Sequence, residues 1–222
     1  FRWADHLARF RRDCETCRIP LALSDSEISS VAQRLIGSDD IHVVTFATPQ
    51  TFTMFTRPVD HGRNHRFQND GATLKVVGHQ PVAACAVLPP QPKHRSRMVW
   101  HIAEVLAGDA VAVLLDRPDG TLTETAIACV LAVIDGTLVT PPRGLILDSI
   151  SLKVALELAA DEGIKIAERE IRRGDWMQAS EMMLAGTGFG IASVRRIDDH
   201  DFTLNRPVCR TLSAAWATAV AQ

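Results

Sequence analysis

The stretch from Leu114 to Ile164, LLDRPDGTLTETAIACVLAVIDGTLVTPPRGLILDSISLKVALELAADEGI, carries the clearest secondary-structure signals in the chain. Apolar runs at 128–134 and 137–139 predict two short strands, and the Asp135-Gly136 pair between them is typical of a tight hairpin. Residues 151–162 have apolar side chains at helical spacing and precede a glycine, a pattern that predicts a helix with a glycine stop. Together these elements favour a mixed α/β fold.

Segments of the same kinds extend from this stretch in both directions. Residues 3–17 have apolar side chains at helical spacing, and residues 24–27 offer caps for a second helix that runs to about Ile36. β-Branched residues between His42 and Phe46 favour a strand. The other predicted elements are a helix over 96–106 and strands over 51–56, 72–77, 82–87, 110–115, 182–184 and 191–194.

A polar stretch divides the chain into two predicted domains. Residues 57–70 contain proline and glycine and have no periodicity, so they are predicted to form a solvated loop between domains. The three basic and two histidine side chains in this stretch are also compatible with a ligand-facing patch, but composition favours the loop. We expect a small N-terminal α/β domain over 1–60, a linker over 61–70 and a larger C-terminal domain over 71–222. Because Phe1 already lies in a helical pattern, we expect further sequence ahead of it.

Composition limits the kinds of partner and compartment. The formal net charge of -2 gives no indication of nucleic acid or an anionic membrane as a partner. No apolar run approaches the roughly 18 residues that span a bilayer, and no signal peptide is visible, so we expect a cytoplasmic protein. The five cysteines are too scattered for a disulfide framework. Cys14 and Cys17 form a lone CxxC in a helical pattern, which predicts two thiols one turn apart and no metal site.

Two segments have features of a phosphate-binding site. Residues 147–151 lead straight into the predicted helix, and helix N-termini attract anions through their free amides. Plain N-capping is the alternative role for Ser151. Residues 186–190, GTGFG, combine three glycines with a hydroxyl and allow a ligand to approach the backbone closely. A tight turn explains the same residues equally well.

Lys93 and Glu124 are candidates for the chemistry itself. Lys93 follows a proline-stiffened segment and is surrounded by His94, Arg95 and Arg97. A partly desolvated lysine among cations has a lowered pKa, which suits Schiff-base formation, whereas a solvated lysine is the ordinary role. Glu124 precedes an apolar strand, where it is either a surface acid or a carboxylate that holds a protonated heterocycle nitrogen.

Several motifs, taken in order along the chain, resemble one enzyme family. HLARF at 6–10 is similar to an "H-x-x-R-L" motif, and PKHRSRM at 92–98 to a "K-H-x-x-R" lysine segment. Residues 114–164 follow a Thr-Glu, "DG-L-TP" and "IL-x-x-I-S/T" pattern, and residues 175–198 follow "A-D-E-x-x-x-x-G-T-x-x-x-x-x-V". These blocks resemble the class IV aminotransferases, which are fold-type IV pyridoxal-phosphate enzymes. The resemblance implies a two-domain enzyme whose larger C-terminal domain has a mixed, barrel-like sheet with helices.

The resemblance also implies roles for individual residues. Lys93 resembles the catalytic lysine that carries pyridoxal 5'-phosphate as a Schiff base and then moves the substrate proton. Glu124 resembles the carboxylate that keeps the pyridine nitrogen of the cofactor protonated. The cofactor phosphate is expected to be bound by a set of residues from both domains: Arg9, Ile150, Ser151 and Thr187. The family implies a homodimer, and no metal is expected.

The chain departs from the family pattern at several points. Cys129 stands where the family usually has Asn, Ser149 where Gly is commoner, and Leu152 where Arg often follows. The family also has a strand-rich segment before the H-x-x-R helix, which contributes part of the active-site wall. We expect the small N-terminal domain over 1–60 to lack these first strands.

Three functions are compatible with these motifs. A transaminase would exchange an amino group between an amino acid and a 2-oxo acid, and generic family membership favours it. The "K-H-x-x-R" form favours 4-amino-4-deoxychorismate lyase, which releases pyruvate and 4-aminobenzoate. A degenerate binding protein that keeps the fold without turnover is the third, and Cys129 and Leu152 support it. The presence of the residues expected for catalysis and cofactor binding opposes it: Arg9, Lys93, Glu124 and Thr187.

Overall fold

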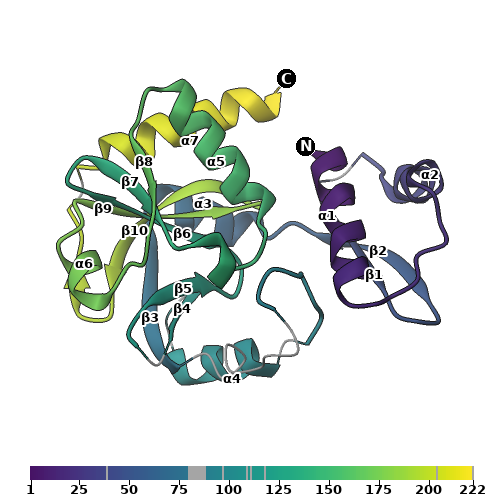
Figure 1. The fold of residues 1–222 in the computed structure, drawn as a ribbon. Helices are drawn as coiled ribbons and strands as arrows, with labels where there is room; N and C mark the ends of the chain where they lie inside the picture. Colours follow the sequence, from purple (N-terminus) through teal and green to yellow (C-terminus); the bar gives the residue numbers. More distant parts are fainter. Residues whose placement is uncertain are drawn as a thin grey trace.

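A computed structural model describes residues 1–38, 40–79, 89–96, 98–108, 110, 112–117, 119–203 and 205–221. The chain forms two units that lie side by side (Figure 1). Within these residues, the small unit contains helices α1 and α2 and a two-stranded sheet, and the large unit contains a nine-stranded sheet with helices around it. The mixed α/β prediction is therefore confirmed. The predicted strand at 82–87 lies outside the described residues.

The small unit follows the sequence pattern closely. Its elements are α1 (Trp3–Thr16), α2 (Asp25–Leu35), β1 (Ile41–Ala47) and β2 (Phe52–Pro58). α2 begins with a capping box, in which the Ser24 side chain accepts from the Glu27 amide and the Glu27 carboxylate accepts from the Ser24 amide. β1 and β2 pair antiparallel from Ile41 opposite Pro58 to Ala47 opposite Phe52.

The predicted loop at 57–70 is largely a helix, which corrects the sequence interpretation. α3 (His61–Asn69) is capped by the Asp60 carboxylate, which accepts from the Arg63 amide at 2.9 Å. Phe67 is 1% exposed and joins the core of the large unit. The connection between the two units is therefore a packed helix, although few of its side chains are apolar. The boundary between domains stays a prediction.

The nine strands of the large unit form a mixed sheet that closes on itself. β10 pairs with β3, β3 with β4, β4 with β5, β5 with β6, β6 with β9 and β9 with β10. These pairings form a closed ring, to which β7, β8 and β11 are added at the outside. The strands are β3 (Ala72–His79), β4 (Ala112–Asp116), β5 (Leu122–Thr125), β6 (Cys129–Ile134), β7 (Thr137–Thr140), β8 (Ile166–Glu168), β9 (Glu181–Gly186), β10 (Gly190–Ile197) and β11 (His200–Asp201).

Strand β6 shows how the sequence fills two cores. Its side chains alternate in direction, as in any strand. Val130, Ala132 and Ile134 belong to one buried cluster with Phe67 of α3. The alternate positions, Cys129, Leu131 and Val133, belong to a second cluster with residues of α5 (Ile150–Asp161) and α7 (Pro207–Ala221). Figure 1 shows α5 and α7 together on one side of the sheet.

Further helices and turns complete the large unit. α4 (Met98–Ala107), α6 (Arg173–Met177) and the short 3-10 helix Arg143–Leu145 accompany α5 and α7. The predicted Asp135-Gly136 turn is confirmed, with φ of 50° and 71°, as the tight β6–β7 hairpin requires. The sequence analysis predicted no element after residue 194 and therefore missed α7. None of the helices in the described part of the chain is long and apolar enough to span a bilayer.

Candidate active site

The N-terminus of α5 faces the turn between β9 and β10. Ser149 is the N-cap, because its hydroxyl accepts from the Leu152 amide at 3.3 Å. This leaves the Ser151 hydroxyl free for another contact, and Ser151 Oγ lies 3.2 Å from Thr187 Oγ1. Ser151 is 5% exposed, whereas Thr187 is exposed at the tip of its turn. The two predicted phosphate-type segments are therefore in direct contact.

Arg9 brings a cation from the small unit to the same helix terminus. It is 8% exposed, and its Nη1 donates to the carbonyl of Asp148 at 3.3 Å, directly before the α5 cap. Its Nε lies 3.8 Å from Asp13 Oδ2 and has no hydrogen-bond partner among the described residues. A buried guanidinium with an unsatisfied donor beside a helix N-terminus is suited to an anion.

Glu124 is buried in β5 and also contacts the segment before α5. It is 8% exposed, and its Oε1 accepts from the Leu147 amide at 3.1 Å. Its Cα partner across the strand pair is Cys129 of β6. Burial, followed by the charge of Glu124, raises the pKa of the Cys129 thiol to about 12, so the thiol stays protonated. The Glu124 side chain is thus held at the segment before α5, beside a protonated thiol.

Lys93 lies near Cys129 and is held through its backbone amide. Its amide donates to Asp13 Oδ2 at 3.1 Å, and the residue is exposed. Its positive charge acts on two neighbours, since it opposes the rise of the Cys129 pKa and helps to lower the pKa of His6. Lys93 therefore lies within electrostatic range of Cys129, the β6 neighbour of Glu124.

His6 is a feature of the site to which the sequence assigned no role of its own. Burial, then the charges of Arg9 and Lys93, lower its pKa to about 4. His6 is therefore neutral near pH 7. It lies on α1 one turn before Arg9, so the same helix face carries both residues toward the large unit.

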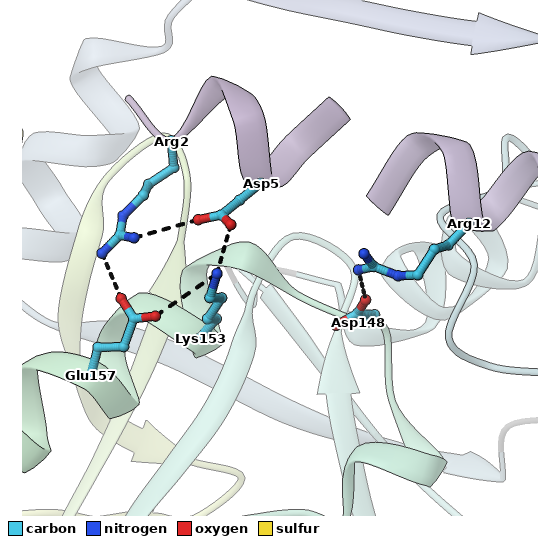
Figure 2. A network of polar contacts seen from close by, with 6 residues as sticks. All are labelled: Arg2, Asp5, Arg12, Asp148, Lys153 and Glu157. Carbon is cyan, nitrogen blue, oxygen red and sulfur yellow. Dashed lines mark hydrogen bonds and ion pairs between the residues drawn. The ribbon is translucent and has the colours of Figure 1, made fainter. Parts of the chain in front are cut away.

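Ion pairs hold α1 against α5 beside the site (Figure 2). Lys153 Nζ lies 2.6 Å from Asp5 Oδ1 and 3.9 Å from Glu157 Oε1, and Arg2 joins both acids. Arg12 pairs with Asp148 at 2.6 Å. A cavity of about 400 Å³ lies next to this interface and is lined by residues of α1, the 89–92 segment and residues 143–153. Lys93, Glu124 and Thr187 are not among its lining residues.

The structure thus gathers the candidate residues at the N-terminus of α5. Ser151 and Thr187 are in contact, and Arg9 and Glu124 hold adjacent residues of the preceding segment. Ile150 is the first residue of α5 and is 5% exposed. The sequence assigned no separate role to His6, Asp13 or the two α3 amides that contact the Thr187 turn, Asn64 and Gln68. The polar stretch that contains these amides was predicted to be a loop.

The family model and the curated relatives that match this chain indicate the same family. The family model described as amino-transferase class IV matches residues 1–197. A probable branched-chain-amino-acid aminotransferase from Thermotoga maritima is 26% identical over 209 residues, which cover 91% of this chain and 74% of the relative. Branched-chain-amino-acid aminotransferase 6 of Arabidopsis thaliana is 29% identical over 75% of this chain, but the match covers only 48% of that protein.

Solved structures agree with the sequence comparison. The crystal structure of a putative branched-chain amino acid aminotransferase from Thermotoga maritima has a TM-score of 0.86 and 25% identity, and the match covers 99% of this chain and 80% of that one. The branched-chain amino acid aminotransferase of Escherichia coli shares the fold, with a TM-score of 0.84 at 19% identity over 98% of this chain and 79% of its own. Because the family model matches most of the chain, this protein belongs to the class IV aminotransferase family.

Proposed function

We propose that this chain binds pyridoxal 5'-phosphate at the α5 N-terminus and transfers amino groups between a branched-chain amino acid and a 2-oxo acid. Membership of the class IV aminotransferases supports the reaction type, and the names of the relatives support the substrate class. Both favour transfer over the lyase reaction. The single observation that carries the proposal is the Ser151–Thr187 contact beside the buried Arg9, because it supplies two hydroxyls, a cation and a helix N-terminus for one phosphate.

The residues present fit this cofactor. A phosphate dianion matches the Arg9 guanidinium, whose Nε lacks a hydrogen-bond partner within the described residues, and the free amides at the start of α5. Glu124 supplies a buried carboxylate of the kind that binds a protonated ring nitrogen. Lys93 supplies the primary amine that anchors the cofactor covalently.

Each side chain then has a separate task. When bound, the cofactor supplies an electron sink for the bonds at the substrate Cα. Arg9, Ile150, Ser151 and Thr187 hold the phosphate and so fix the position of the ring. Glu124 holds the proton on the ring nitrogen. Lys93 Nζ takes the proton from the substrate Cα, a role that requires it to be uncharged at that stage.

Covalent trapping tests the proposal. The purified full-length protein is expected to be yellow, and borohydride reduction followed by peptide mass mapping should find the cofactor on Lys93. Lys93→Ala should lose both the visible band and amino transfer, whereas Lys165→Ala, an exposed lysine elsewhere, should keep both. A colourless protein that takes up no added pyridoxal 5'-phosphate would contradict the proposal. Pyruvate release from 4-amino-4-deoxychorismate without a 2-oxo acid would instead favour the lyase.

A further inference from the structure

Thr187 lies at the tip of a short hairpin turn whose geometry decides where its hydroxyl points. The turn joins β9 to β10, and Gly186 is paired with Gly190 across it. The Phe189 amide donates to the Gly186 carbonyl at 3.3 Å. A three-residue turn with flanking glycines has little intrinsic preference for one conformation. The position of the Thr187 hydroxyl, 3.2 Å from Ser151 Oγ, therefore depends on what holds the turn from outside.

Side chains on one face of α3 hold the turn that contains Thr187. Asn64, Phe67 and Gln68 lie at helical spacings of three and four residues, so their side chains point the same way. Asn64 Nδ2 donates to the Gly188 carbonyl at 2.5 Å, and Gln68 Nε2 donates to the Phe189 carbonyl at 3.1 Å. The Phe67 ring meets the Phe189 ring edge-on, with centroids 5.1 Å apart.

The other sides of the turn are closed by steric contact. Gly190 has φ of +73°, and a Cβ added there would lie 2.7 Å from the Trp216 ring of α7. A Cβ on Gly188 would lie 3.2 Å from the His42 ring of β1. Asn64 is 7% exposed, and its Oδ1 has no hydrogen-bond partner in the described part of the chain. Only the NH₂ group of this buried amide is hydrogen-bonded, and its partner is the Gly188 carbonyl. Because buried polar groups are normally hydrogen-bonded, this contact accounts for the position of Asn64.

We propose that Asn64 and Gln68 are positioning residues for Thr187. Their amides fix two consecutive carbonyls of the turn, so that the Thr187 hydroxyl faces Ser151 and the phosphate of the cofactor. This inference rests on the proposed function, because the phosphate is its ligand. Since α3 connects β2 of the small unit to β3 of the large unit, the same helix ties the arrangement of the two units to the phosphate site.

Cofactor titration distinguishes positioning from general stability. Pyridoxal 5'-phosphate and pyridoxal share the ring and aldehyde, but only the first has the phosphate. Removal of one amide donor is expected to raise the Kd for pyridoxal 5'-phosphate about tenfold, from the loss of one hydrogen bond in an oriented site. Asn64→Ala and Gln68→Ala should both show this rise, measured by the visible absorbance, while the Kd for pyridoxal stays unchanged. Gln68→Glu keeps the size without the N–H donor and should behave as Gln68→Ala.

Matched controls make the outcomes separable. Asn69→Ala removes an exposed amide of the same helix, which contacts His65 and not the turn, and should leave both constants unchanged. If Asn64→Ala fails to fold, the exposed Gln68 variants carry the test. The inference is overturned if the wild type binds the cofactor and the variants bind it equally tightly, or if their constants for both ligands rise together. A wild type that binds neither ligand overturns the proposed function itself, and this inference with it.

Discussion

The histidine on α1 makes the stability of the cofactor-free protein depend on pH in a way that one substitution removes. His6 has a pKa of about 4 in the folded protein and 6.5 when unperturbed, chiefly because of burial and then because of the charges of Arg9 and Lys93. At a pH between these two values, His6 is protonated in the unfolded chain but not in the folded chain. Unfolding is therefore favoured as the pH falls. The perturbation is His6→Gln, which keeps a polar side chain without the titration.

The magnitude follows from the two pKa values. Each pKa unit corresponds to about 1.4 kcal/mol, and the full shift of His6 therefore amounts to about 3 kcal/mol, reached below pH 4. Between pH 7 and pH 5, linkage gives about 2 kcal/mol of lost stability from this residue alone. Because His6 is only half-buried, this is an upper limit.

Urea unfolding at pH 7, 6 and 5 measures the difference. The wild type should lose up to about 2 kcal/mol more than His6→Gln over this range. His101 is an exposed histidine of α4, and His101→Gln should retain the wild-type dependence. Parallel pH curves for wild type and His6→Gln would refute the reasoning, as would a wild type that becomes relatively more stable at pH 5.

Three further substitutions test the packing around the site. Gly190→Ala places a side chain at a positive-φ position and against the ring of Trp216. We expect it to lower the free energy of unfolding by about 3 kcal/mol or more, as measured by chemical denaturation. Gly120→Ala, with φ of +81° and no atom within 4 Å, should lower it by only about 1 kcal/mol. Equal losses would argue against the steric contact. Phe67→Ala leaves a cavity at a 1%-exposed position and should cost about 3–5 kcal/mol of unfolding free energy; a loss below about 1 kcal/mol would show that α3 is not packed as described. Lys153→Met breaks two ion pairs of a side chain that is 46% exposed, so the free energy of unfolding should fall by less than about 1 kcal/mol at low salt. This difference should vanish near 1 M NaCl, and a difference that does not depend on salt would contradict an electrostatic origin.

Local sequence patterns predicted the elements whose signals lie within a few consecutive residues. The caps at residues 24–27 before α2 and the Asp135-Gly136 turn are of this kind. α3 was missed because hydrophobic periodicity registers apolar side chains only. Of its buried residues, one is Phe67 and the other is Asn64, an amide whose partner lies 124 residues away.

The family resemblance predicted the individual residues of the candidate site. Their arrangement in space could be seen only in the folded structure. Ser151 and Thr187 are 36 residues apart, and no local pattern indicates that their hydroxyls meet. They meet because β9 pairs with both β6 and β10, which closes the ring of strands and brings the β9–β10 turn to α5. The sequence indicated two separate phosphate-type segments, and the closed ring of strands brings them into contact.

The buried thiol of Cys129 provides an internal reporter for the packing around β6. It is 1% exposed and its pKa is about 12, so burial and protonation both oppose alkylation. Its side chain belongs to the cluster that β6 forms with α5 and α7. Reaction with iodoacetamide therefore requires a transient local opening of this packing, and its rate, followed at this cysteine by peptide mapping, reports on that opening in the manner of amide hydrogen exchange. The residue that departs from the family pattern thus reports on local opening of the large unit without any engineered label.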